Sequence, residues 1–208
     1  MTLSSDSGQG RPTLVLMHFF GSSHREWHEV IHHLDPAARV ATLDMPGFGD
    51  ARDRPGYDVA AMTRHVIAEV EAAGLDEVVL VGHSFSGRIA MTVAAERPAW
   101  LRALVLIAPS PPGPQTISAE EHRFQLDFDF SEAQARAFID GASALALDPA
   151  TYQRAVEDAI NATPAAWRAW PEHTYAEDWR ERVGVLDLPA WVLVGDRDPS
   201  LQIGRAHV

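Results

Sequence analysis

Short apolar runs alternate along this chain with segments of helical periodicity. Five runs show no polar alternation, at residues 14–17, 40–43, 78–82, 103–108 and 190–195. Runs of this kind, rich in Val and Leu, are typical of strands covered on both faces of a sheet. Because they alternate with helical patterns, the chain is predicted to form an α/β fold with a mainly parallel sheet.

Three helices are predicted between these runs. In the first, at residues 23–34, Ser23 and Glu26 have the spacing of a capping box. The second begins at the N-cap Asp58 and stops at Gly74, and the third follows the run at 78–82 and ends before Pro98. The side chains predicted to face the core are Trp27, Val30, Ile31 and Leu34 in the first helix and Val59, Met62, Val66 and Val70 in the second.

Residues 111–186 interrupt the alternation of apolar runs and helical patterns. After the loop "SPPGPQ" come helical stretches without a clear strand, rich in Phe and with tryptophans at 167, 170 and 179. One interpretation is an ordinary helical core. The interpretation we favour is a helical cap between two strands, with aromatic side chains over an apolar pocket. The chain is therefore divided into a core at 1–110, a cap at 111–186 and a return to the core at 187–202.

The stretch "VVLVGHSFSGRIA", residues 78–90, carries the main chemical prediction. A buried strand leads into Ser84 and a helix starts directly after it, which presents the serine hydroxyl at the carboxyl edge of the sheet. Such a strained turn requires small neighbours two residues away, and Gly82 and Ser86 are small. The helix N-terminus also favours negative charge developing there. We interpret Ser84 as a nucleophile rather than as the turn serine of an unrelated βα unit.

Three further motifs accompany this turn: "LVLMHFFGSS" at 14–23, "DMPGFGD" at 44–50 and "WVLVGDRDP" at 191–199. In this order the four motifs resemble the α/β-hydrolase fold family over about residues 12–202, in a capped form similar to serine esterases. The resemblance implies that the backbone N–H groups of Phe20 and Phe85 form an oxyanion hole, with Phe19 in place of the usual glycine. It also implies that His18 braces this loop and that His83 packs against the sheet.

The acid of the implied catalytic triad falls in "GDRDP". The family pattern indicates Asp198 and leaves Asp196 to shape the turn, although either residue can stand at a strand end. The task of the acid is to orient a histidine and stabilise its charged form. No cofactor is implied, because serine chemistry needs a base, an acid and an oxyanion hole.

The triad histidine is expected after Asp198, where the sequence offers His207, nine positions on. The family places a helix and a strand in that interval, which nine residues cannot supply, although a tail that folds back onto Ser84 stays possible. The final "IGRAHV" also matches the translation of a common sequencing adapter, ATC GGA AGA GCA CAC GTC, before a stop codon. We therefore expect native sequence to end at or just before Gln202, residues 203–208 to be a non-native tail, and the last strand and helix of the fold to be missing. Such a chain is predicted to be poorly soluble and essentially inactive.

The amino-acid composition limits the kinds of molecule that the protein is expected to bind. The 17 basic and 29 acidic residues give a net charge of −12, which disfavours nucleic acid and anionic membranes and favours a small, neutral or apolar molecule. The chain has no cysteine, no hydrophobic signal core and no apolar run of membrane-spanning length, so a cytoplasmic protein is predicted. His28 and His32 lie one helical turn apart, but no further ligand completes a metal site, and we predict none. Oligomeric state is left open.

Three functions follow from these observations. The first is hydrolysis of small acyl esters through an acyl-enzyme on Ser84. The second keeps the fold but uses other chemistry, as in cofactor-free lyases, C–C bond hydrolases and perhydrolases. The third is a ligand-binding relative without turnover.

Overall fold

A computed structural model describes residues 3–198 and confirms the predicted α/β fold. Within that range, six strands form one sheet in the order β1-β3-β2-β4-β5-β6. The neighbouring pairs among β2 to β6 are parallel, and β1 runs antiparallel to β3. The strands are β1 (Leu3–Ser7), β2 (Thr13–Met17), β3 (Arg39–Leu43), β4 (Val78–His83), β5 (Leu101–Ile107) and β6 (Ala190–Leu193). The five predicted runs correspond to β2 through β6.

Strand β1 was not predicted, because its sequence LSSDS is polar. Polar contacts attach it to the edge of the sheet. The hydroxyls of Ser5 and Thr42 lie 2.8 Å apart, and the Arg39 guanidinium donates two hydrogen bonds to the Asp6 carboxylate. An exposed edge strand does not need the apolar pattern of a buried one.

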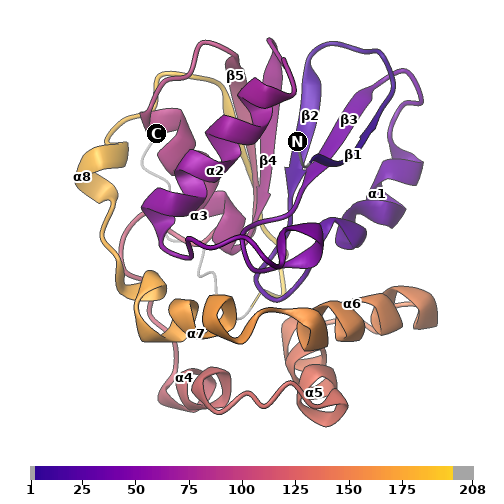
Figure 1. Cartoon of the computed structure of the whole chain (residues 1–208), viewed down its shortest axis with the longest axis vertical. Helices are drawn as coiled ribbons and strands as arrows, with labels where there is room; N and C mark the ends of the chain where they lie inside the picture. The colour runs from indigo at the N-terminus through magenta and orange to yellow at the C-terminus, as the bar shows by residue number, and fades with distance from the viewer. Residues whose placement is uncertain (1–2, 199–208) are drawn as a thin grey trace.

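Helices cover both faces of the central sheet (Figure 1). On one face α2 (Val59–Ala72) and α3 (Phe85–Ala95) share a core with Val15 and Met17 of β2. On the other, the 3₁₀ turn η1 (His24–Trp27) and α1 (His28–His33) pack near Leu14 and Leu16. Neighbouring residues of β2 thus face opposite layers, as a strand buried on both sides requires.

Helices α2 and α3 form as predicted, and the Asp58 carboxylate accepts the N–H of Ala61 as an N-cap. The first helix differs from the prediction. The Ser23 hydroxyl accepts the N–H of Arg25, but the Glu26 side chain bonds elsewhere, so no capping box forms. Val30 is 44% exposed rather than buried, because α1 is short and only its near side meets the sheet.

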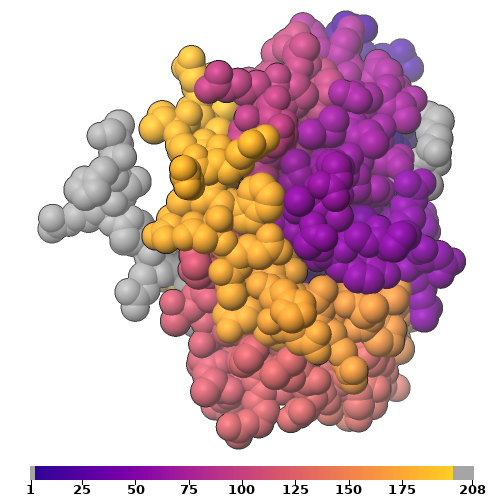
Figure 2. Space-filling model, turned by 60° about the vertical axis from the view of Figure 1, so that its left-hand side comes forward, coloured from indigo at the N-terminus to yellow at the C-terminus, as the bar shows by residue number. Residues whose placement is uncertain are grey.

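Between β5 and β6 the chain is helical, and we call residues 119–183 the helical segment. Most of it, residues 119–176, lies beyond one end of the sheet, whereas residues 180–183 lie beside α3 (Figure 1). The pink to orange surface of the segment packs against the purple surface around residues 50–60 (Figure 2). None of the helices in residues 3–198 is both long and apolar enough to cross a membrane. The elements of the helical segment are α4 (Ala119–Leu126), α5 (Glu132–Ala142), α6 (Pro149–Asn161), α7 (Pro164–Glu172), η3 (Thr174–Ala176) and α8 (Arg180–Val183).

Strand β6 is exposed, which corrects the prediction that every strand is covered on both faces. Trp191, Val192 and Leu193 have exposed fractions of 57%, 60% and 53%. Within residues 3–198, β6 forms the edge of the sheet beside β5, and no helix of the described chain covers it. The expected tail at 203–208 and His207 lie outside the described residues.

The buried Asp44 carboxylate, directly after β3, joins three segments at the carboxyl edge of the sheet. It accepts hydrogen bonds from the Ser4 hydroxyl (2.9 Å), the N–H and ring Nδ1 of His24 (2.5 and 2.8 Å) and the N–H of Asp50 (2.7 Å) in the 3₁₀ turn η2 (Gly49–Ala51). Burial opposes the charged form of Asp44, but the hydrogen bond from His24 and the other donors outweigh it and lower its pKa to about 2. The same hydrogen bond raises the pKa of His24.

Asp44→Asn tests this junction. The folded pKa of Asp44 is about 2 against an ordinary 3.8, so its stabilisation is present above pH 3.8 and is lost as pH falls through about 2. That shift corresponds to about 2 kcal/mol. Urea titrations should show that Asp44→Asn is less stable at pH 7 and loses less stability on acidification than the wild type. Asp53→Asn, an exposed control, should keep the wild-type dependence, and an unchanged slope in Asp44→Asn would contradict the account.

Trp167 is expected to stabilise the helical segment. Its side chain is fully buried and stacks on Phe128, with 3.8 Å between the ring centroids. Trp167→Ala is expected to lower the free energy of unfolding by about 3–5 kcal/mol, because it removes a large buried ring. Leu145→Ala is the matched control, since Leu145 is 70% exposed and should change stability by less than about 0.5 kcal/mol. Equal effects in denaturant titrations would show that Trp167 is not a core residue.

Candidate functional site

Ser84 occupies the turn between β4 and α3 in a strained backbone conformation, with φ 54° and ψ −118°. Positive φ is uncommon for a residue with a side chain and is found at functional turns. The turn is held by β5 and the loop after it: the Ser84 N–H donates to the Ile107 carbonyl, and the Ser110 N–H donates to the Ser84 carbonyl, both at 2.9 Å. The structure thus forms the strand-to-helix turn that the sequence predicted.

Glycines permit the close approach at this turn. A Cβ on Gly82 would lie 2.6 Å from the Ser86 carbonyl oxygen, and one on Gly87 would lie 2.5 Å from the Pro109 Cβ. The need for a small residue was predicted at Gly82 but not at Gly87. Ser86 is fully buried, and its hydroxyl donates a hydrogen bond to the carbonyl of His18. The second small residue of the turn therefore also attaches the loop after β2.

The predicted oxyanion loop, residues 18–21, follows β2 and has a fixed backbone. The Phe19 N–H donates to the Glu26 carboxylate at 2.9 Å. The Phe19 carbonyl accepts from His18 Nδ1 at 2.7 Å and from the Ser22 N–H at 3.2 Å. Because the C=O and N–H of a trans peptide point in opposite directions, these contacts also fix the direction of the Phe20 N–H.

His18 braces this loop, as expected. Its ring is fully buried, and Nε2 accepts the Met45 N–H at 3.0 Å while Nδ1 donates to the Phe19 carbonyl. An imidazole that accepts through one nitrogen and donates through the other is neutral. Both nitrogens are occupied, so His18 has a structural role.

His83 was expected to pack against the sheet. It is half-buried at the end of β4, its Nδ1 donates to the Glu26 carboxylate at 2.9 Å, and its ring centroid lies 5.4 Å from that of Phe19 and 6.3 Å from that of Trp27. Burial alone would lower the pKa of His83, but the charges of Glu26 and Asp198 outweigh it and raise the pKa.

Asp198, the predicted acid, follows β6 in a turn closed by its own N–H and the Gly195 carbonyl at 3.2 Å. It is half-buried, whereas Asp196 is exposed. Because β4, β5 and β6 run parallel, Asp198 after β6 and Ser84 after β4 both follow strands that end at the same edge of the sheet. Within residues 3–198 the Ser84 hydroxyl makes no hydrogen bond, and the His207 candidate lies outside that range.

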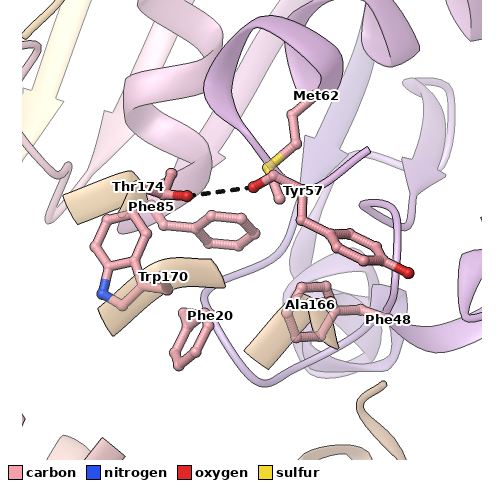
Figure 3. Close-up of a pocket in the computed structure, with 8 residues that line it drawn as sticks. All are labelled: Phe20, Phe48, Tyr57, Met62, Phe85, Ala166, Trp170 and Thr174. Carbon is pink, nitrogen blue, oxygen red and sulfur yellow. Dashed lines mark hydrogen bonds between the residues drawn. The ribbon is translucent and has the colours of Figure 1, made fainter. Parts of the chain in front are cut away.

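An aromatic crevice lies beside the turn (Figure 3). Its side chains lie so close together that no space among them is wide enough for a water molecule. The core and the helical segment both contribute. The lining residues are Phe20, Phe48, Tyr57, Met62, Phe85, Ala166, Trp170 and Thr174.

Arg88, one turn after Ser84 in α3, was not identified from the sequence. Its buried guanidinium donates to the carbonyls of Pro111 and Gly113 before the helical segment and of Thr174 and Tyr175 near its end. Burial lowers the pKa of Arg88 to about 10 despite the charge of Glu177. Arg88 therefore attaches the loop before the helical segment, and η3 near the end of the segment, to α3. These partners are far apart in sequence, so no local pattern shows them.

Two groupings resemble metal ligand sets. His28 and His32 are both exposed, with ring centroids 5.5 Å apart. The ligand atoms of His24, Asp44 and Asp50 lie within 4.8 Å of one another. The Asp44 oxygens already accept four hydrogen bonds, so this group is accounted for by its structural role.

Comparisons with known proteins agree with this geometry. The sequence profile of the alpha/beta hydrolase fold matches residues 12–187. A 2-succinyl-6-hydroxy-2,4-cyclohexadiene-1-carboxylate synthase of Klebsiella pneumoniae (strain 342) is 30% identical over 97% of this chain and 85% of its own length. A pimeloyl-[acyl-carrier protein] methyl ester esterase of Yersinia pestis is 29% identical over 58% of this chain and 49% of its own length.

Solved structures show the same fold. A bromoperoxidase from Bacillus anthracis superposes with a TM-score of 0.82 at 21% identity, over 92% of this chain and 76% of its own. An esterase from Exiguobacterium antarcticum superposes with a TM-score of 0.80 at 18% identity, over 90% of this chain and 74% of its own. The profile match and the near full-length relative settle the classification: this chain is a member of the α/β-hydrolase fold family.

Proposed function

We propose that the protein is a serine hydrolase that cleaves small acyl esters through an acyl-enzyme on Ser84. The observation that carries the proposal is the strained Ser84 turn at the N-terminus of α3, beside a loop whose backbone is fixed. In this reaction the Ser84 oxygen attacks the acyl carbon and gives its proton to a base. The leaving alcohol takes that proton, and water then cleaves the acyl-enzyme.

Two backbone donors suit the oxyanion that this attack creates. Phe85 is the first residue of α3, where N–H groups have no partner within the helix. The direction of the Phe20 N–H is set by the bonds that hold Phe19. Donors fixed in advance need no rearrangement as charge develops, and each contributes about 3 kcal/mol to lowering the barrier.

We assign the acid to Asp198 and leave the base to a histidine that follows it, in the order of the family. His18 is engaged with Met45 and Phe19. His83 bonds to Glu26 through Nδ1. Within residues 3–198 neither histidine forms a hydrogen bond with the Ser84 hydroxyl, so we assign the base to neither. A serine nucleophile without its histidine loses on the order of 10⁶ in kcat, so this 208-residue chain should turn over esters poorly unless His207 serves.

The aromatic crevice favours an apolar acyl group, and we interpret the helical segment as the cap of the substrate pocket. Trp170 and Thr174 contribute from the segment, and Phe20 and Phe85 contribute from the core. Since no water fits among these side chains, a substrate enters only when the segment or the rings move. Arg88 limits that movement at the loop before the segment and at η3.

A second candidate is cofactor-free chemistry on a carboxylated ring compound. It is favoured by the similarity to the cyclohexadiene-carboxylate synthase, which spans 97% of this chain, whereas the esterase match spans 58%. The two functions predict different activities toward simple esters. A protein that is phosphonylated at Ser84 when its histidine is present, yet does not hydrolyse simple esters, would favour the second.

A fluorophosphonate probe tests the nucleophile. The 208-residue chain should be labelled slowly at Ser84, because the hydroxyl lacks a hydrogen-bonded base among the described residues. Mass spectrometry should find the adduct in the wild type and in the control Ser143→Ala, but not in Ser84→Ala. Adduct on another residue, or none after hours at high probe concentration, would overturn the proposal.

His207→Ala tests the expected non-native tail. If residues 203–208 have no role, this substitution should leave labelling and ester turnover unchanged. Rapid hydrolysis of a p-nitrophenyl ester that His207→Ala abolishes would show that the tail supplies the base.

A further inference from the structure

The Glu26 carboxylate connects the two strand ends that form the candidate site. Its Oε2 accepts the backbone N–H of Phe19, after β2, and its Oε1 accepts Nδ1 of His83, the last residue of β4; both distances are 2.9 Å. Glu26 comes from a third segment, η1, and its side chain is 12% exposed. A nearly buried carboxylate with one strong donor on each oxygen is held firmly in place.

The contact fixes the peptide that the proposed function uses. The N–H of Phe19 is bound by Glu26, and the carbonyl of Phe19 is bound by His18. The peptide units on both sides of Phe19 are therefore anchored, and the next N–H is that of Phe20. Loss of the Glu26 contact would release one of the two anchors while leaving Ser84 and α3 untouched.

The partner on the other oxygen is adjacent to the nucleophile. Because a carboxylate only accepts, His83 Nδ1 carries the proton of this bond. The acidic groups that act on His83 are Glu26 from η1 and Asp198 from the turn after β6, and its neighbouring rings are those of Phe19 and Trp27. Glu26 therefore faces a donor whose charged form it stabilises.

We propose that Glu26 is a positioning residue, which holds the oxyanion loop against His83 and so directs the Phe20 N–H toward the transition state at Ser84. The catalytic part of this inference rests on the proposed function, whereas the contact with His83 does not. A capping role is excluded for the Glu26 side chain, since its two oxygens bond to Phe19 and His83 instead.

Glu26→Gln tests the proposal in the 208-residue chain, with Glu29→Gln as the matched control. Glu29 lies three residues on, is exposed and pairs with Arg154. A glutamine offers one acceptor and one donor, so it cannot accept both bonds. We expect NMR titration of His83 to show an acid dissociation constant about tenfold larger in Glu26→Gln than in the wild type. Glu29→Gln should titrate like the wild type.

The second readout is the kinetics of fluorophosphonate labelling at Ser84. The maximal labelling rate should fall about tenfold in Glu26→Gln, while the probe concentration at half-maximal rate stays unchanged, because the loop acts on the transition state. A purely structural role would instead lower the melting temperature and weaken probe binding. If Glu26→Gln does not fold, His83→Gln removes the other partner and should give the same fall in rate.

The outcomes separate this inference from the proposed function. Unchanged titration of His83 in Glu26→Gln, or an unchanged maximal rate, overturns the role of Glu26. Failure of the wild type to label at Ser84 overturns the proposed function and the catalytic part of the inference together. In that case a changed His83 titration would still support the contact itself.

Discussion

The backbone turn at Ser84 is the constraint around which the site is built. A side-chain-bearing residue at φ 54° carries strain of about 1–3 kcal/mol and persists only where its surroundings determine it. Here the surroundings are the hydrogen bonds to Ile107 and Ser110 and the glycines at 82 and 87. Ser86 links this turn to the loop after β2, because its hydroxyl donates a hydrogen bond to the His18 carbonyl. The conformation of Ser84 and the path of residues 18–21 are thus set by the same few residues.

Two acidic side chains, one buried and one nearly buried, hold the loops at this edge of the sheet in place. The Asp44 carboxylate accepts hydrogen bonds from β1, η1 and η2, and the Glu26 carboxylate accepts them from the residues at the ends of β2 and β4. Each oxygen accepts hydrogen bonds, which offsets the cost of burying charge. The many acidic residues of this chain therefore include some with specific structural tasks.

The sequence predicted the parts of the fold that local periodicity and capping determine. Strands β2 to β6 follow apolar runs, and α2 runs from the Asp58 cap to Gly74. It did not predict β1, whose polar residues pair along an edge of the sheet. The turn at Ser84 could be predicted because the small residues that it requires, Gly82 and Ser86, lie two positions away in the sequence. The contacts of Glu26 and Arg88 could not, because their partners lie 7 to 87 residues away.

The most direct test of this account is a crystal structure of the Ser84 phosphonate adduct. The tetrahedral phosphorus would occupy the place of the acyl carbon in the transition state. We predict that one phosphonyl oxygen accepts hydrogen bonds from the N–H groups of both Phe20 and Phe85, at about 2.7–3.1 Å. A phosphonyl oxygen turned toward solvent, with the Phe20 N–H directed elsewhere, would contradict the assigned oxyanion hole and the hydrolase mechanism built on it.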